Sequence, residues 1–140
     1  MKLQINKSTT IAEVQTEFSK LFPFLKIEFF TRSRETDGSL WSKHMVFNRT
    51  KTMDEIGQIK ADDNTIEISP SMTVNTFEQN LQKDFGLSVQ VFRKSGNVWL
   101  QTTATDEWTL AAQNQKAMEM EKRTASDKNI IDAGVRQELE

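Results

Sequence analysis

Two segments of this chain carry the same pattern of residues, residues 3–30 and residues 66–93. In each segment an alternating stretch leads to a threonine and an apolar stripe, and a second alternating stretch follows. The aligned pairs are Leu3 and Ile66, Ile5 and Ile68, Ser8 and Ser71, Thr10 and Thr73, Ile11 and Val74, Val14 and Phe77, Phe18 and Leu81, Phe22 and Phe85, Pro23 and Gly86, Leu25 and Leu87, Ile27 and Val89, and Phe29 and Val91. Self-similarity at a fixed spacing is the signature of a repeated structural unit, so we predict a tandem duplication.

The first unit covers residues 1–60. Alternation of polar and apolar residues predicts strands over residues 2–6, 25–31 and 40–47. Thr10 and Glu13 have the spacing of a capping box, in which two side chains satisfy free amides at a helix start. The apolar stripe that follows predicts a helix that ends before Pro23. Thr52 and Glu55 repeat the capping-box spacing, so a second, short helix is expected over residues 53–59.

The second unit covers residues 65–122 and repeats this order of elements. Strands are expected over residues 65–69, 87–94 and 97–103, with helices over residues 74–85 and 107–122. Thr73 is the expected N-cap of the first helix, and Gly86 is well placed for the left-handed residue that often ends a helix. Thr105 or Asp106 is expected to cap the second helix. In the strand over residues 97–103, Val98 and Leu100 lie on one face and Trp99 and Gln101 on the other, and Trp99 is partly exposed if Val98 and Leu100 point into the core.

The two units together predict an α+β fold, a tandem duplication of a βαββα unit with a mixed sheet and helices packed mainly on one face. Strands on either side of a crossover helix would be parallel if they shared a sheet. Residues 1–122 are expected to form one domain, because two separate units of about 60 residues would each have a thin core. The polar tail, residues 123–140, is expected to be disordered or lightly docked, with a partner-binding helix as the alternative.

The composition describes a mildly acidic protein with 36% hydrophobic residues, nine Phe and a formal net charge of −2. Most nucleic-acid-binding proteins are basic, so a pI near 5.5 disfavours that function. The absence of cysteine excludes disulfides, thiolate metal sites and cysteine nucleophiles. No apolar stretch has the length of a signal-peptide core or a membrane span, so a cytoplasmic location without membrane contact is expected.

No motif in the sequence identifies an activity. His44 is the only histidine and has no serine or carboxylate at a catalytic spacing, so we interpret it as structural. A zinc site needs three or four ligands, and only carboxylates are present to join His44. The βαββα unit is superficially similar to small nucleic-acid-binding folds such as KH domains, but their GXXG loop is absent, so the similarity implies no function. We expect a protein that is not an enzyme and has no cofactor or metal site.

Basic and tryptophan residues occur together in both predicted hairpins. Residues 32–51 have an excess of positive charge that includes Arg49, and the second hairpin has a matching pair of basic residues. The candidate partner-binding residues are Arg32, Arg34, Trp41, Arg93, Lys94, Trp99 and Gln101. A tryptophan flanked by arginine is typical of protein-interface hot spots, and edge strands are able to pair with a partner or a second copy.

Two functions fit these hairpins. The first is a binding or adaptor protein that engages a protein partner or itself through the surface around Trp99. The alternative is single-stranded nucleic-acid binding, in which bases stack on tryptophan beside basic side chains. The negative net charge makes the protein partner the preferred expectation.

Overall fold

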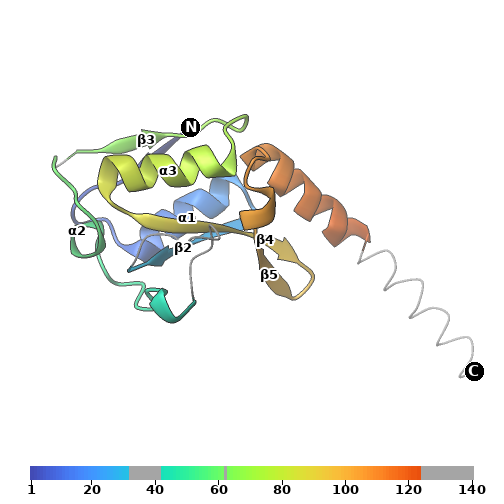
Figure 1. The fold of residues 1–140 in the computed structure, drawn as a ribbon, viewed down its shortest axis with the longest axis horizontal. Coiled ribbons are helices and arrows are strands. Elements are labelled where there is room, and N and C mark those ends of the chain that lie inside the picture. Colours follow the sequence, from blue (N-terminus) through green and yellow to red (C-terminus); the bar gives the residue numbers. More distant parts are fainter. Residues whose placement is uncertain (32–41, 62, 124–140) are drawn as a thin grey trace, which may run out of the picture.

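The computed structural model describes residues 1–31, 42–61 and 63–123 and confirms the α+β class (Figure 1). Strands and helices alternate along the described chain, and residues 110–123 form a further helix. The elements in order are β1 (Lys2–Gln4), α1 (Ile11–Leu21), β2 (Leu25–Phe30), the 3₁₀ turn η1 (Ser42–His44), α2 (Met53–Ile56), β3 (Thr65–Glu67), α3 (Val74–Phe85), β4 (Ser88–Ser95), β5 (Val98–Gln101) and the 3₁₀ turn η2 (Thr103–Thr105).

The strands form two antiparallel sheets, so the expectation of one mixed sheet is wrong. The short sheet pairs β1 with β3, and the larger sheet has the order β2-β4-β5. Each strand that precedes a long helix pairs with its counterpart in the other unit, and the strands that follow the helices do the same. The two strands on either side of α1 therefore lie in different sheets, and the rule for parallel crossovers does not apply to them.

The register places aligned positions of the two units opposite each other. Leu3 pairs with Ile66 in the short sheet. Glu28 pairs with Gln90 in the larger sheet. A twofold axis through the centre of each pairing would produce this register, because the central residue then lies opposite its own equivalent and its neighbours pair reciprocally. The duplication itself stays a prediction.

Backbone hydrogen bonds at the helix starts also correspond between the units. In each unit, two backbone hydrogen bonds connect the start of the long helix with the start of the later helix. They belong to an isolated β-bridge between two threonines, Thr10 with Thr52 and Thr73 with Thr109. The corresponding N–H to O distances are Ile11 to Lys51 at 2.9 Å and Val74 to Trp108 at 3.0 Å, then Met53 to Thr9 at 2.8 Å and Leu110 to Met72 at 2.9 Å.

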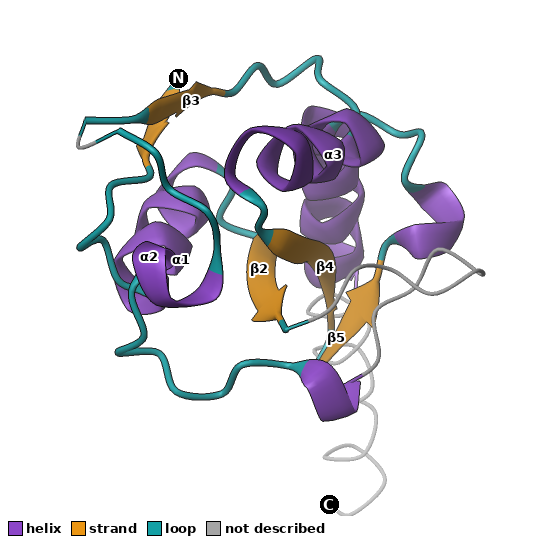
Figure 2. Cartoon of the chain, turned by 60° about the vertical axis from the view of Figure 1, so that its left-hand side comes forward, coloured by secondary structure: helices purple, strands orange, loops and turns teal. Residues whose placement is uncertain are grey.

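The core lies between the two sheets, where α1 and α3 pack (Figures 1 and 2). The rings of Phe18 from α1 and Phe77 from α3 stack with their centroids 5.3 Å apart. One continuous cluster of buried side chains includes residues from both units and from both sheets. Burial of these apolar side chains is the main force that holds the helices against the larger sheet.

Local signals at the helix ends are confirmed. Thr10 with Glu13, and Thr52 with Glu55, form complete capping boxes. Thr73 caps α3 by accepting the N–H of Thr76. The glycine that ends α3, Gly86, has the expected left-handed backbone, with φ of 63°.

Two predicted elements differ from the structure. Within the predicted strand over residues 40–47, the described part is the turn η1 and a single bridge from Met45 to Phe30. Two backbone hydrogen bonds, Thr31 N–H to His44 and Val46 N–H to Phe29, form this bridge, and the described part of the segment continues into no ladder. The last helix begins at residue 110 rather than 107, because the turn η2 occupies residues 103–105. Thr109 caps it instead of Thr105 or Asp106, and accepts the N–H of Ala112.

Candidate functional site

The β4–β5 hairpin carries the predicted binding residues that the structure describes. Lys94 pairs with Trp99 across the hairpin, and Phe92 pairs with Gln101. Because side chains alternate along a strand, these four side chains share one face, and Arg93 belongs to the opposite face. The remaining predicted residues, Arg32, Arg34 and Trp41, lie outside the described part of the chain.

Every residue of β5 is exposed. The exposed fraction is 56% for Val98, 38% for Trp99 and 42% for Leu100. Val98 and Leu100 are therefore not buried in the core, and Trp99 is partly exposed. The ladder between β2 and β4 ends at Arg93, so the hairpin extends beyond the region that α1 and α3 cover (Figure 1).

Arg93 is held against the last helix on one face of the hairpin. Its guanidinium carbon lies 5.7 Å from the ring centroid of Trp108, and Nη1 donates to Gln113 Oε1 at 2.9 Å. Gln113 is fully buried and donates its amide to the carbonyl and hydroxyl of Thr105, each at 2.8 Å. Trp108 is 40% exposed and adds apolar surface next to Arg93. The apolar pattern that predicts the last helix does not indicate that Arg93 contacts Trp108 and Gln113.

Lys26 lies against the aromatic side chains of the other face. Its Nζ is 5.0 Å from the ring centroid of Trp99 and 5.5 Å from that of Phe92. The same ammonium pairs with Glu28 Oε1 at 3.4 Å. Cation–π contacts of this kind orient a tryptophan ring and keep positive charge at its face. The sequence alone does not indicate Lys26, because it does not show that β2 lies next to β4.

A chain of hydrogen bonds extends from Glu28 to Arg49. The amide Nε2 of Gln15, on α1, donates to the carbonyl of Ile27 at 2.8 Å and to Glu28 Oε2 at 3.2 Å. The Oε1 atom of Gln15 accepts from Nε of Arg49 at 2.7 Å. These bonds fix the Gln15 amide and position the exposed Arg49 side chain, whose two Nη atoms have no carboxylate partner among the described residues.

These residues line a hollow of about 620 Å³ between α1, β2 and the hairpin, hereafter the Trp99 groove. Its volume is in the range of small-ligand sites. The lining residues are Gln15, Thr16, Ser19, Lys20, Pro23, Leu25, Lys26, Glu28, Arg49 and Trp99. Three cationic side chains and one carboxylate belong to this set, so the Trp99 groove is positively charged within a chain whose net charge is −2.

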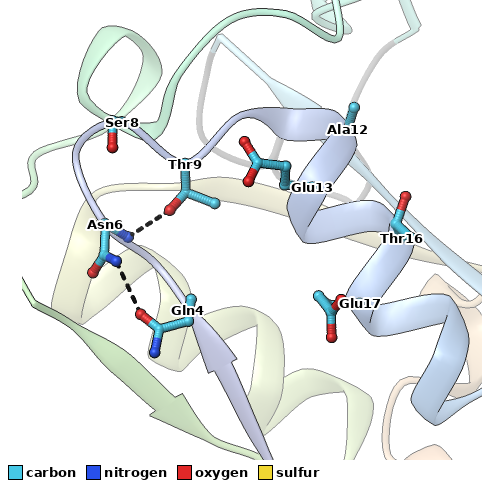
Figure 3. Close-up of a pocket in the computed structure, with 8 residues that line it drawn as sticks. All are labelled: Gln4, Asn6, Ser8, Thr9, Ala12, Glu13, Thr16 and Glu17. Carbon is cyan, nitrogen blue, oxygen red and sulfur yellow. Dashed lines mark hydrogen bonds between the residues drawn. The ribbon is translucent and has the colours of Figure 1, made fainter.

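A second hollow, of about 630 Å³, lies at the start of α1 (Figure 3). Most of its polar side chains already have structural partners. The amide of Asn6 donates to Gln4, and its backbone N–H donates to Thr9. Glu13 belongs to the capping box of α1, and Glu17 pairs with a lysine one turn later. Neither a cation nor an aromatic ring lines this hollow, so it is the weaker candidate for a binding site.

No cluster of metal ligands is gathered in the described chain. No three His, Cys, Asp or Glu side chains among residues 1–31, 42–61 and 63–123 come together as a metal site. His44 ends the turn η1, and its carbonyl accepts the N–H of Thr31 at 2.8 Å. It lies in a turn rather than within a strand as expected, and its main chain bonds the residue that follows β2.

Comparisons with known proteins find no match to this chain, neither among models of protein families, nor among curated proteins, nor among solved structures. Among the described helices, none combines the length and apolar character needed to cross a membrane.

Proposed function

We propose that this protein is a non-enzymatic binding protein that takes up an extended segment of a protein partner along the outer edge of β5. The observation that carries the proposal is the exposure of all four residues of this edge strand. Buried strands and well-packed hairpins have at least one covered face, whereas β5 presents apolar side chains on both faces. Exposed apolar surface of this kind is typical of protein interaction sites.

The backbone of β5 supports strand addition. Lys94 donates its N–H to the carbonyl of Phe24 at 3.0 Å, so its main-chain polar groups face β2. Its cross-strand neighbour Trp99 is therefore in a non-hydrogen-bonded pair and turns its own N–H and C=O away from β4. The same alternation applies to Gln101. No described strand pairs with this outer edge, and a peptide in extended conformation would complete its hydrogen bonds.

Side chains around the edge supply contact area on both faces. Trp99 lies on one face, and Val98, Leu100 and Trp108 lie on the other. Tryptophan and arginine are the residue types most enriched at interface hot spots, and Arg93 lies against Trp108. A partner segment with alternating apolar residues would place them against both surfaces.

A proline at position 101 tests the backbone pairing. Gln101→Pro removes the N–H that points away from β4, and proline is tolerated on an edge strand when its missing N–H faces solvent. We expect this variant to stay folded and to lose the partner in a tagged pull-down from native lysate, while Gln101→Ala, which keeps the N–H, retains it. Trp99→Ala is expected to lose the partner as well.

Light scattering after size exclusion separates the two kinds of partner. If the partner is a second copy of this chain, the mass of the wild-type protein doubles and that of Gln101→Pro does not. Equal capture of the same proteins by wild type, Gln101→Pro and Trp99→Ala would rule out β5 as the binding edge.

A further inference from the structure

The Trp99 groove has a different chemistry from the β5 edge. Its walls contain hydroxyl, amide and charged groups from α1, β2 and the segment before α2. Three cations, Lys20, Lys26 and Arg49, line it against the single carboxylate of Glu28. Lys20 is also 3.1 Å from Glu17, but an exposed pair of this kind is weak and screened by salt. The charge of the Trp99 groove fits an anion.

The guanidinium of Arg49 is held in a position where it is able to bind an oxyanion. Its Nε atom is used by Gln15, and Gln15 is itself fixed because its Nε2 bonds Ile27 and Glu28. The two Nη atoms are left with no carboxylate partner in the described chain. A guanidinium held in this way offers its planar donor fork at little entropic cost, and phosphate oxygens match that fork.

Glu28 does not oppose an anion strongly. Its Oε1 atom pairs with Lys26 at 3.4 Å and its Oε2 atom accepts from Gln15 at 3.2 Å. Thr16 adds a hydroxyl to the same wall, whereas the Ser19 hydroxyl already donates to the carbonyl of Leu25 at 3.4 Å. The excess of two positive charges over negative ones in the lining favours a ligand with two negative charges over a single carboxylate.

Trp99 adds a planar aromatic surface at the same hollow. It is 38% exposed and has the Lys26 ammonium at its ring. A planar ring beside cationic donors is the arrangement that binds a base together with its phosphate, because every base offers a face for stacking. We propose that the Trp99 groove binds a nucleotide unit, with phosphate at Arg49 and Lys26 and the base against Trp99.

The test uses adenosine monophosphate, a ten-residue oligothymidylate, adenosine and inorganic phosphate as probes of the full-length protein at low salt. Calorimetry is expected to show binding of the monophosphate or the oligonucleotide, weaker binding of phosphate, and none of adenosine. Arg49→Gln is expected to weaken binding about tenfold through loss of a charge-assisted pair. Lys26→Gln is the second variant and is expected to weaken it in the same direction.

Lys83→Gln is the matched control, because Lys83 lies in the last turn of α3 at the position that corresponds to Lys20 and does not line the Trp99 groove. It removes the same charge and is expected to leave binding unchanged. Trp99→Leu is expected to weaken binding of the nucleotide and leave that of phosphate unaltered. Circular dichroism of each variant shows that the fold is kept.

The probes also identify the source of the nucleotide unit. Much tighter binding of the oligonucleotide, with strong salt dependence, assigns single strands as the ligand, and equal binding assigns free nucleotides. The proposal is overturned if neither probe binds, if phosphate binds as tightly as the monophosphate, or if Lys83→Gln weakens binding as much as Arg49→Gln. Gln101→Pro does not alter the Trp99 groove, so failure of the β5 proposal and failure of this one are distinguishable.

Discussion

Gly57 lies where the end of α2 meets the junction of α3 and β4. A Cβ atom at this position would be 2.5 Å from Leu87 Cδ2 and 2.7 Å from the carbonyl oxygen of Phe85. The φ of −136° is open to any residue, so close contact and not backbone strain excludes a side chain here. We expect Gly57→Ala to lower the free energy of unfolding by about 1–3 kcal/mol, measured by urea denaturation, because a backbone atom must move.

Gly96→Ala is the control for that prediction. Gly96, in the β4–β5 turn, has a φ of 60°, and nothing lies within 4 Å of an added Cβ atom. Alanine there meets backbone strain alone, at a cost of roughly 1 kcal/mol. A larger loss from Gly96→Ala than from Gly57→Ala would contradict the argument from close contact.

The pKa of the Glu55 carboxyl is expected to lie below its ordinary value. The Thr52 backbone N–H, the Thr52 hydroxyl and the nearby Lys51 ammonium, in that order, lower the pKa of Glu55. Because folding lowers this pKa, the ionised carboxylate stabilises the folded state at neutral pH, and that contribution is lost as the pH falls through the folded-state pKa. We expect Thr52→Val to raise the pKa of Glu55, followed by NMR titration of its carboxyl carbon.

Thr50→Val provides the comparison for that titration. The hydroxyl of Thr50 donates to Asn48 at 2.6 Å and does not contact Glu55. The pKa of Glu55 is expected to be the same in this variant as in the wild type. An unchanged pKa in Thr52→Val would show that the Thr52 hydroxyl does not control the titration.

At the scale of elements, Gln15 joins α1 to the outer edge of β2. Its amide donates to the carbonyl of Ile27, which faces away from β4, and Gln15 is only 8% exposed. Gln15→Leu would leave that carbonyl without its donor. We expect a loss of about 1–3 kcal/mol in the free energy of unfolding. Gln79→Leu, at an exposed site of α3, is expected to cost much less, and equal losses would contradict a specific role for the bond.

Short-range signals explain which elements were predictable. The capping boxes at Thr10 and Thr52 and the left-handed Gly86 depend on residues a few positions apart, and the structure has all three. Strand pairing depends on residues far apart, so alternation did not show that both sheets are antiparallel. It also did not distinguish the turn η1 from a strand, since a single bridge at Met45 replaces a ladder.

The Trp99 groove was predictable only in part for the same reason. Trp99 was expected to be a binding residue, and Arg49 belonged to a noted excess of basic residues. Gln15 belongs to α1 and Lys26 to β2. No sequence motif relates these two residues to Trp99 or to Arg49. Their contact follows from the packing of α1 on β2 and of β4 between β2 and β5, which is a property of the whole sheet.

At the scale of the whole molecule, the two units depend on each other for their sheets. β1 pairs with β3, and β2 pairs with β4, so both of these pairings join a strand of the first unit to a strand of the second. The Phe18 and Phe77 rings meet between them. The backbone N–H of Gln58 donates to the carbonyl of Phe85, a further link between the units. The first unit does not contain the partner strands of β1 and β2, and the second unit does not contain the partner strand of β3.

Separated units are therefore expected not to fold. Residues 1–60 alone would expose the edges of both strands and the face of α1 that packs on α3, and a chain of about 60 residues buries too little surface to compensate. Circular dichroism and NMR of residues 1–60 and of residues 61–140 should each show an unfolded chain, and an equimolar mixture should recover the helical signal. The intact chain should unfold in urea in one transition that is the same by fluorescence and by circular dichroism. Two transitions, or a folded fragment on its own, would mean that each unit closes its own core and that the pairing between units contributes little to stability.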